Sequence, residues 1–303
     1  MQHDGRVTME AEICDIDPAF EALEPAETRA PVIFNSPHSG RLYPPHFIDQ
    51  VRLDLPLLRR SEDTGVDMLF AGVVERGMPL MRVHFPRSMV DVNREPYELD
   101  PRMFDGRLPT FANTRSMRVA GGLGTIPRVV GEAQEIYARR LPVDEALVRI
   151  ETLYKPYHRA LRRLIASVHR AFGEALLVDC HSMPSMAPVR EDKPRADIVI
   201  GDRYGTSCSP SVGDLIEGVL RARGYNVVRN KPYAGGFITE HYGQPQTGVH
   251  AVQIEINRAI YMDERTYRPT ADFGRLQADL MTLAEALARL PLDRAGDWRI
   301  AAE

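Results

Sequence analysis

Residues 174–181 have the sequence EALLVDCH, and this stretch decides the fold. Its apolar run ends in polar side chains, which predicts a buried strand at the centre of a sheet. Residues 250–257, HAVQIEIN, alternate β-branched with polar side chains and predict a second strand. Both strands carry acidic or imidazole groups near their carboxyl ends.

Further strands and helices are predicted on either side of these two. The expected strands are 31–36, 79–85, 196–202 and 225–230. Residues 87–95 either extend the strand 79–85 or form the next edge strand. The expected helices are 62–76, 143–172 with a kink or a break at Pro156, 210–223 and 272–289. Strands that alternate with helices predict an α/β layered fold with a largely parallel central sheet.

Composition excludes several classes of protein. The chain has 303 residues, a net charge of -4 and 44% hydrophobic residues, as in an ordinary globular protein. Mild acidity argues against nucleic-acid binding, and no apolar run approaches the ~20 residues that span a bilayer. Three scattered cysteines indicate neither a disulfide framework nor a Cys-based zinc site. We therefore expect a cytoplasmic enzyme with a small-molecule substrate and no nucleic-acid or membrane partner, of unknown oligomeric state.

The domain organisation is expected to be simple. No composition break demands a boundary, which predicts a polar N-terminal arm at 1–30, a single domain at 31–292 and a C-terminal tail at 293–303. The first 30 residues lack the basic and apolar regions of a signal peptide.

Four predicted strand ends carry polar clusters, and ligands normally bind at the carboxyl ends of strands in such a sheet. The clusters are 35–40, 91–95, 179–182 and 255–258. His38 lies in the turn S-P-H-S-G, where it is either a structural histidine or a functional one. Period-two geometry puts Asp179 and His181 on one face and Cys180 on the other. His181 is then a metal ligand oriented by Asp179, part of a nucleophilic relay, or a structural histidine.

Carboxylates and arginines near the other strand ends have two interpretations each. Glu255, inside a β-branched strand, is either a general base or the partner of Arg258 in an ion pair. Asn93 and Arg94 offer donors for a substrate carboxylate, or Arg94 forms a surface ion pair with Glu95.

Two loops and one pair of carboxylates complete the candidates. Glu62 and Asp63 are either helix-capping groups or metal ligands. The stretch 100–130 is expected to be a long loop, and its glycines at 120–128 indicate flexibility or a lid. His241 lies in a second Gly-rich loop, 235–243, in reach of a substrate or without a chemical role.

Seven motifs in this order tie the segments together: NSPHSG, EDTGVD, RSMVDVNRE, YKPYHRAL, VDCHSMPS, YAGGFITEHYG and VQIEINRAIYMDE. The order resembles the N-formylglutamate amidohydrolase family over about residues 30–290. That family is similar in layout to zinc carboxypeptidases and aspartoacylases, which implies a three-layer α/β/α fold with a mixed, largely parallel sheet.

The resemblance also implies a Zn²⁺ site. His38 and His181 match the family's histidines. The carboxypeptidase pattern has its carboxylate ligand three residues after the first histidine, where this chain has Arg41. The third ligand is therefore placed at Asp63, with Glu62 as its rival.

The remaining roles follow from the same resemblance. Glu255 is the base that takes a proton from the metal-activated water, and Asp179 orients His181. Asn93 and Arg94 bind one carboxylate of the substrate. The candidates for a second carboxylate are Arg87, Arg128 and Arg258.

The implied reaction is hydrolysis of N-formyl-L-glutamate to formate and L-glutamate, a step of histidine degradation. The same machinery acting on another N-acyl amino acid or short peptide is one alternative. A non-catalytic protein that binds small carboxylates on the same fold is a second, and a metal-free cysteine hydrolase using Cys180 is a third.

Overall fold

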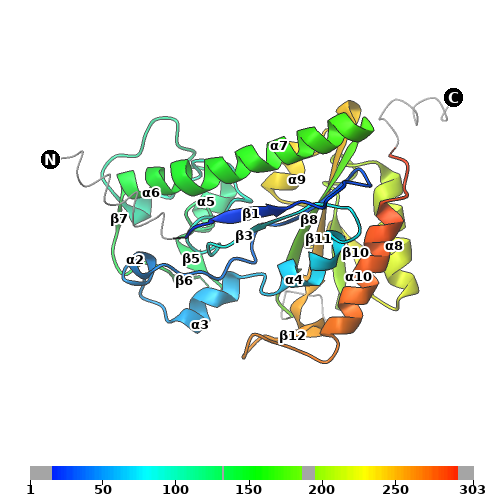
Figure 1. Ribbon diagram of the computed structural model, residues 1–303. Helices are drawn as coiled ribbons and strands as arrows, with labels where there is room; N and C mark the ends of the chain where they lie inside the picture. Colours follow the sequence, from blue (N-terminus) through cyan, green and yellow to red (C-terminus); the bar gives the residue numbers. More distant parts are fainter. Residues whose placement is uncertain (1–15, 132, 186–194, 293–303) are drawn as a thin grey trace. The chain divides into compact units, whose positions relative to one another are not determined.

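A computed structural model describes residues 16–131, 133–185 and 195–292 (Figure 1). Its internal contacts divide the chain into two compact units. Unit 1 comprises Met1–Glu21, Pro37–Thr64 and Arg82–Leu161; unit 2 comprises Ala22–Ser36, Gly65–Met81 and Arg162–Glu303. The expected arm, single domain and tail stay a prediction, and residues 1–15 and 293–303 lie outside the described part of the chain.

The main sheet has seven strands in the order β1-β3-β2-β8-β11-β9-β10. Their bounds are β1 Phe20–Leu23, β2 Val32–Ser36, β3 Leu80–Val83, β8 Ala175–Met183, β9 Ile198–Gly201, β10 Val227–Arg229 and β11 Val249–Asn257. β8 pairs in parallel with β2 and β11, and β9 pairs in parallel with β10. β11 and β9 are antiparallel, so the sheet is mixed and largely parallel, as predicted.

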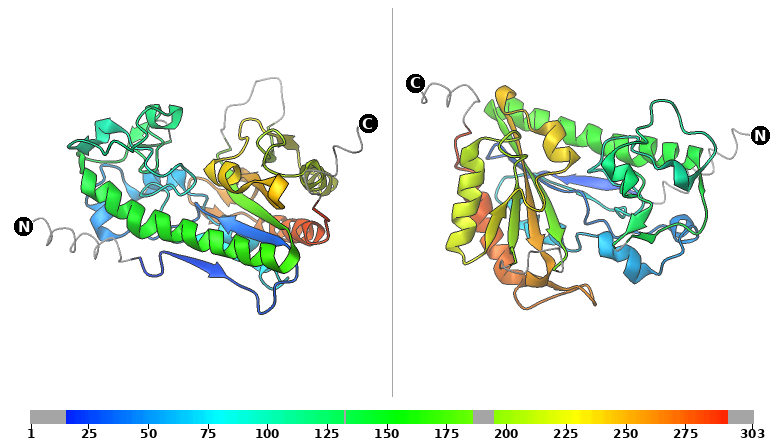
Figure 2. Two further views of the ribbon diagram at one scale, coloured as in Figure 1. Left: turned by 90° about the horizontal axis from the view of Figure 1, so that it is seen from above. Right: turned by 180° about the vertical axis from the view of Figure 1, so that it is seen from behind.

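In unit 2, helices cover both faces of the sheet. On one face, alternate residues of β2, β8, β9 and β11 join the apolar core with α4 (Val66–Phe70), α8 (Pro210–Ala222) and α10 (Phe273–Leu287). α8 and α10 lie side by side in Figures 1 and 2. On the other face α9 (Phe237–Tyr242) contacts β8 and β11, and the rear view in Figure 2 brings it to the front. This arrangement confirms the predicted α/β/α layers.

Shorter elements complete the two units. In unit 1 they are α2 Pro45–Ile48, α3 Leu55–Leu58, η1 Arg59–Ser61, η3 Pro101–Met103, β4 Phe104–Asp105, α5 Met117–Ala120, β5 Val129–Val130, β6 Gln134–Glu135 and β7 Leu141–Pro142. In unit 2 they are η2 Ala71–Val73, η5 Pro245–Thr247, η6 Arg258–Ile260, β12 Met262–Asp263 and β13 Arg268–Pro269.

The longest helical stretch matches its prediction except at the proline. α6 (Val143–Arg149), the π-helical turn η4 (Ile150–Tyr154) and α7 (Lys155–Phe172) follow one another without a break. Pro156 has no N–H and its ring crowds the preceding turn, which the wider π-helical turn accommodates. The stretch is therefore not split at Pro156, and the helix changes type locally just before it.

Four segments differ from their predictions. The stretch 100–130, expected to be a loop, contains the short elements η3, β4, α5 and β5. The helix expected at 62–76 begins only at Val66, because Gly65 adopts φ +81 and Glu62 is extended. Residues 87–95 form no strand; they are turns, and Asp91 and Arg94 within them bond to residues distant in the sequence. The loop expected at 235–243 contains the short helix α9. β1, within the stretch expected to be a polar arm, is a strand that the patterns missed.

No helix among the described residues is both long and apolar enough to cross a membrane.

Candidate metal centre and active site

The two central strands place polar side chains on the sheet face opposite the apolar core. In β8, Leu176, Val178 and Cys180 belong to the core cluster, so Asp179 and His181 lie on the other face. In β11, Val252, Ile254 and Ile256 belong to the core, so Gln253 and Glu255 share the polar face. The same alternation in β2 adds Asn35. One face of the sheet therefore carries the chemistry.

His181 is buried and held by a carboxylate two residues earlier in its own strand. Its Nε2 lies 2.9 Å from Asp179 Oδ2. Asn35 Nδ2 donates to the other oxygen, Oδ1, at 2.8 Å. With Asp179 accepting a hydrogen bond from Nε2–H, the lone pair that a metal would need is on Nδ1 of His181.

His38 has the same arrangement in unit 1. It follows β2 by two residues and is buried, with Nε2 2.7 Å from Asp91 Oδ1. Its Nδ1 lies 3.4 Å from Asp63 Oδ2, and Asp63 N donates to His38 O at 2.9 Å. The turn after His38 needs Gly40, because a Cβ there would lie 2.0 Å from Phe85 O.

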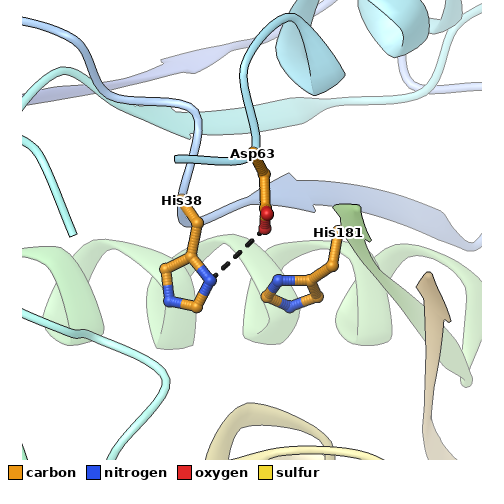
Figure 3. Close-up of side chains that lie close together, drawn as sticks. All are labelled: His38, Asp63 and His181. Carbon is orange, nitrogen blue, oxygen red and sulfur yellow. Dashed lines mark ion pairs between the residues drawn. The ribbon is translucent and has the colours of Figure 1, made fainter. Parts of the chain in front are cut away.

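These side chains form a group of potential metal ligands. His38, Asp63 and His181, all buried, each offer one ligand atom, and the three atoms lie within 4.8 Å of one another (Figure 3). Two imidazoles and one carboxylate, with a position left for water, are a donor set suited to a catalytic zinc ion. Carboxylates at both Nε2 atoms fix the tautomer that this requires. The donor set and its surroundings therefore fit the implied metal.

Glu62, the rival of Asp63, is bound elsewhere. Its carboxylate accepts from Tyr43 Oη at 2.6 Å, from Arg59 Nε at 3.1 Å and from Thr64 Oγ1 at 2.8 Å. Burial and this carboxylate raise the pKa of Tyr43. Three donors thus hold Glu62 in a structural role, which favours Asp63 as the third ligand.

Glu255 is the carboxylate next to His181 in the sheet. The two residues are Cα partners in the parallel register of β8 and β11. Gln253 Nε2 donates to Glu255 Oε1 at 2.7 Å, and Gln253 Oε1 accepts from Gly236 N before α9 at 2.7 Å. A buried carboxylate held beside a candidate metal ligand is well placed for a general base.

Asp91 is the common partner of both arginines of the RSMVDVNRE motif, Arg87 and Arg94. Arg87 Nε donates to its Oδ2 at 2.9 Å, and Arg94 Nη2 lies 3.6 Å from the same oxygen. Burial opposes ionisation of Asp91, but Arg87, Arg94 and His38 hold its pKa well below the usual value. Burial, with Arg87 and Arg118 nearby, lowers the pKa of Arg94 to about 10 against the pull of Asp91, so the guanidinium stays charged at neutral pH.

The backbone on both sides of Asn93 is fixed by two helical residues. His158 Nε2 lies 2.9 Å from Val92 O, and Tyr154 Oη donates to Arg94 O at 2.7 Å. Arg94 itself donates to Leu123 O and Asn93 O, each at 2.8 Å. These two carbonyl groups therefore fix the orientation of the Arg94 guanidinium.

Comparison with known proteins places the chain in a family. A family model described as N-formylglutamate amidohydrolase matches residues 30–262. The chain belongs to the N-formylglutamate amidohydrolase family. It is similar to the N-formylglutamate deformylase of Pseudomonas aeruginosa, with 30% identity over 92% of this chain and 97% of the relative. A deformylase of Pseudomonas putida is 31% identical over 79% of this chain and 86% of the relative.

Solved structures agree with this assignment. The N-formylglutamate amidohydrolase of Ralstonia eutropha JMP134 is 37% identical, with a TM-score of 0.84 over 89% of this chain and 97% of the other. A protein of Agrobacterium tumefaciens, at 20% identity and a TM-score of 0.63 over 89% of this chain and 93% of the other, shares the fold. As a member of the N-formylglutamate amidohydrolase family, the chain is a hydrolase of amide C–N bonds.

Three further substrate-binding candidates from the sequence, Arg128, Arg258 and His241, lie in different surroundings. Arg128 forms ion pairs with Asp100 at 2.8 Å and Glu135 at 3.0 Å. Arg258 is buried in η6 and its Nε donates to Ser182 Oγ at 3.0 Å. His241 is exposed on α9 and stacks on Phe237.

The alternative of a cysteine hydrolase is wrong for Cys180. Its thiol lies in the apolar core, on the face opposite His181. Burial, and secondarily the charge of Asp179, raise the pKa of the Cys180 thiol well above its usual value. A protonated, enclosed thiol is a poor nucleophile.

Three groups of the candidate site received no individual role from the sequence: Asn35 and Asp91, which lie in two of the predicted polar clusters, and Gln253, which lies in none. Period-two alternation carried the signal for Gln253, which shares a face with Glu255, and for Asn35, which follows an apolar run. Asp91 lies in a stretch without regular structure, so only its place in the motif marked it.

Proposed function

We propose that the chain hydrolyses N-formyl-L-glutamate to formate and L-glutamate with a Zn²⁺ ion held by His38, Asp63 and His181. The observation that carries the proposal is the convergence of these three ligand atoms within 4.8 Å, with Glu255 paired to His181 in the sheet. Membership of the N-formylglutamate amidohydrolase family supports the substrate.

A zinc ion bound there would polarise the formyl carbonyl and lower the pKa of a water molecule towards ~7. Glu255 would accept a proton from that water as its oxygen attacks the formyl carbon. When the C–N bond breaks, Glu255 would return the proton to the departing amine nitrogen of glutamate. Gln253 holds the Glu255 carboxylate by a hydrogen bond to Oε1.

The two carboxylates of the substrate need positively charged side chains to bind them. Arg94 is proposed to bind one carboxylate together with Asn93. Its hydrogen bonds to Leu123 O and Asn93 O fix the orientation of the guanidinium. For the second we favour Arg258, three residues after Glu255 and bonded to Ser182, the neighbour of His181.

The other candidates for substrate binding are less favoured. Arg87 and Arg128 have carboxylate partners at 2.9 and 2.8 Å. His241, exposed on α9, remains a candidate substrate contact. A role in histidine degradation, which the family resemblance implies, and a cytoplasmic location, which the few scattered cysteines favour, are part of the same proposal.

The test is formate release from a panel of N-formyl and N-acetyl amino acids by the purified chain, with chelator and with added Zn²⁺. We expect release from N-formyl-L-glutamate that chelator abolishes and Zn²⁺ restores. Chelator-sensitive release from another member alone would keep the mechanism and change the substrate. Metal-free preparations that retain full turnover would contradict the proposal.

A further inference from the structure

Asp91 lies at the centre of a buried polar group in unit 1. Its Oδ1 is 2.7 Å from His38 Nε2 and accepts from Asn93 N at 2.9 Å. Its Oδ2 accepts from Arg87 Nε at 2.9 Å and faces Arg94 Nη2 at 3.6 Å. Each oxygen therefore has its own set of donors: the imidazole and a backbone amide on one side, two guanidinium groups on the other.

The backbone of Asp91 is also fixed. Asp91 N donates to Thr125 O at 2.8 Å, and Thr125 N donates to Glu98 O at 2.9 Å. Gly124 makes this close approach possible, because a Cβ there would lie 2.1 Å from Glu98 O. The segment Leu123–Thr125 thus holds Asp91 through Thr125 O and Arg94 through Leu123 O.

These contacts determine which nitrogen of His38 carries the proton. A carboxylate accepts only, so Asp91 Oδ1 requires a hydrogen on His38 Nε2. The Nδ1 lone pair is then the one that faces Asp63 Oδ2, 3.4 Å away. The wrong tautomer would place a hydrogen where a metal ligand needs a lone pair.

We propose that Asp91 is a positioning residue for the metal ligand His38, and that Arg87 and Arg94 lock the carboxylate orientation on which this depends. The inference rests on the proposed function, since it takes His38 as a zinc ligand. It adds a role for the arginines, which hold a metal ligand in place through Asp91.

Asparagine at position 91 is a sharp probe because either amide orientation loses a contact. An NH₂ group in place of Oδ2 would face two guanidinium groups, whereas in place of Oδ1 it would face one backbone N–H and His38. The cations favour the second orientation, so the amide donates to His38 Nε2. Asp91→Asn therefore favours the His38 tautomer with its proton on Nδ1, and this proton competes with the metal for Nδ1.

Asp179→Asn is the matched control. Asp179 holds the other histidine ligand in the same way, with Nε2 of His181 at 2.9 Å, and its second oxygen accepts from Asn35. Both substitutions remove one carboxylate that contacts a histidine ligand. Only Asp91→Asn is expected to change the tautomer of His38.

The experiment has two readouts besides turnover. Zn²⁺ affinity is measured by competition with a chromophoric chelator, and the His38 tautomer by long-range ¹H–¹⁵N correlation on the metal-free chain, assigned with His38→Gln. We expect His38 protonated on Nε2 in the wild type and in Asp179→Asn, and on Nδ1 in Asp91→Asn. Both variants should lose about 10- to 100-fold in Zn²⁺ affinity.

The possible outcomes separate the inference from the proposed function. Wild-type His38 protonated on Nδ1, a measurement that needs no variant, overturns the inference, as does unchanged Zn²⁺ affinity in Asp91→Asn. Zinc binding without formate release from N-formyl-L-glutamate overturns the proposed reaction and leaves the role of Asp91 intact. A wild type that binds no Zn²⁺ overturns both.

Discussion

His181 and Glu255 are partners in the parallel register of β8 and β11, and both side chains lie on the face of the sheet opposite the apolar core. The pairing of these two strands thus positions a candidate metal ligand and a candidate base, and neither residue lies in a loop. Sites built on strands hold their geometry better than sites built on loops.

Replacing the base should separate chemistry from metal binding. Glu255→Gln keeps the shape of the side chain but cannot accept the proton. We expect kcat for formate release to fall by about 10²- to 10⁴-fold, with Zn²⁺ content unchanged by elemental analysis. Glu285→Gln, at a surface carboxylate paired with Arg76, is the control. Full turnover in Glu255→Gln would rule out this base.

The two neighbouring carboxylates should differ when each is neutralised. Asp63→Asn should abolish stoichiometric Zn²⁺ binding, because it removes one of the three proposed ligands. Glu62→Gln should keep the metal and instead lower the stability by about 1–3 kcal/mol, since its charged hydrogen bonds to Arg59 and Tyr43 weaken. Metal titration and thermal unfolding of both variants check this; the reverse pattern would make Glu62 the ligand.

The arginines should also be distinguishable by kinetics. Arg94→Lys loses the planar fork that suits a carboxylate, so KM for N-formyl-L-glutamate should rise by about tenfold or more, the equivalent of 1.5–3 kcal/mol. Arg128→Lys, whose ion pairs are with Asp100 and Glu135, should leave KM within about twofold. Equal increases in KM would return Arg128 to the substrate site.

Two glycine-to-alanine substitutions should have opposite signs. At Gly124 a Cβ would lie 2.1 Å from Glu98 O, so Gly124→Ala should destabilise the protein by about 1–3 kcal/mol and raise KM by displacing Leu123. At Gly218, inside α8, a Cβ meets nothing within 4 Å, so Gly218→Ala should stabilise by about 0.5–1 kcal/mol. Denaturant unfolding of both variants measures the difference.

The thiols should resist alkylation in the folded protein. Burial raises the pKa of Cys208 to about 12 and that of Cys180 well above its usual value. Since the reactive thiolate forms only as pH rises through the folded pKa, we expect little iodoacetamide labelling at pH 8 in a Cys14→Ser background. Labelling should become complete in denaturant. Rapid labelling of native Cys180, with loss of activity, would revive the cysteine mechanism.

Much of the sheet was predictable, because most of its strands are short apolar runs or alternating patterns. Such patterns can be recognised in the sequence without knowledge of the fold. The pattern of 174–181 also placed Asp179 and His181 on one face correctly. What the sequence alone did not provide was the identity of the third ligand: Glu62 and Asp63 are adjacent and chemically alike. Only their partners, three donors for Glu62 and the His38 side chain for Asp63, distinguish them.

The errors in the predicted helix boundary and in the role of Asp91 have two different causes. The helix expected at 62–76 was placed too early because apolar spacing carries no information about the left-handed Gly65 that delays it. The role of Asp91 was missed because its partners come from other parts of the sequence: His38 from the turn after β2 and Thr125 from the Gly-rich loop. Long-range partners of this kind leave no periodic signal.

The hydrogen bond from Asn35 to Asp179 joins residues that are 144 positions apart, across the pairing of β2 with β8. During synthesis, His38 and Asp63 emerge more than a hundred residues before His181. The nascent chain therefore holds an incomplete ligand set until this distant pairing closes, a slow kind of folding event. Acquisition of a tightly bound zinc ion would then report that β2 and β8 have paired.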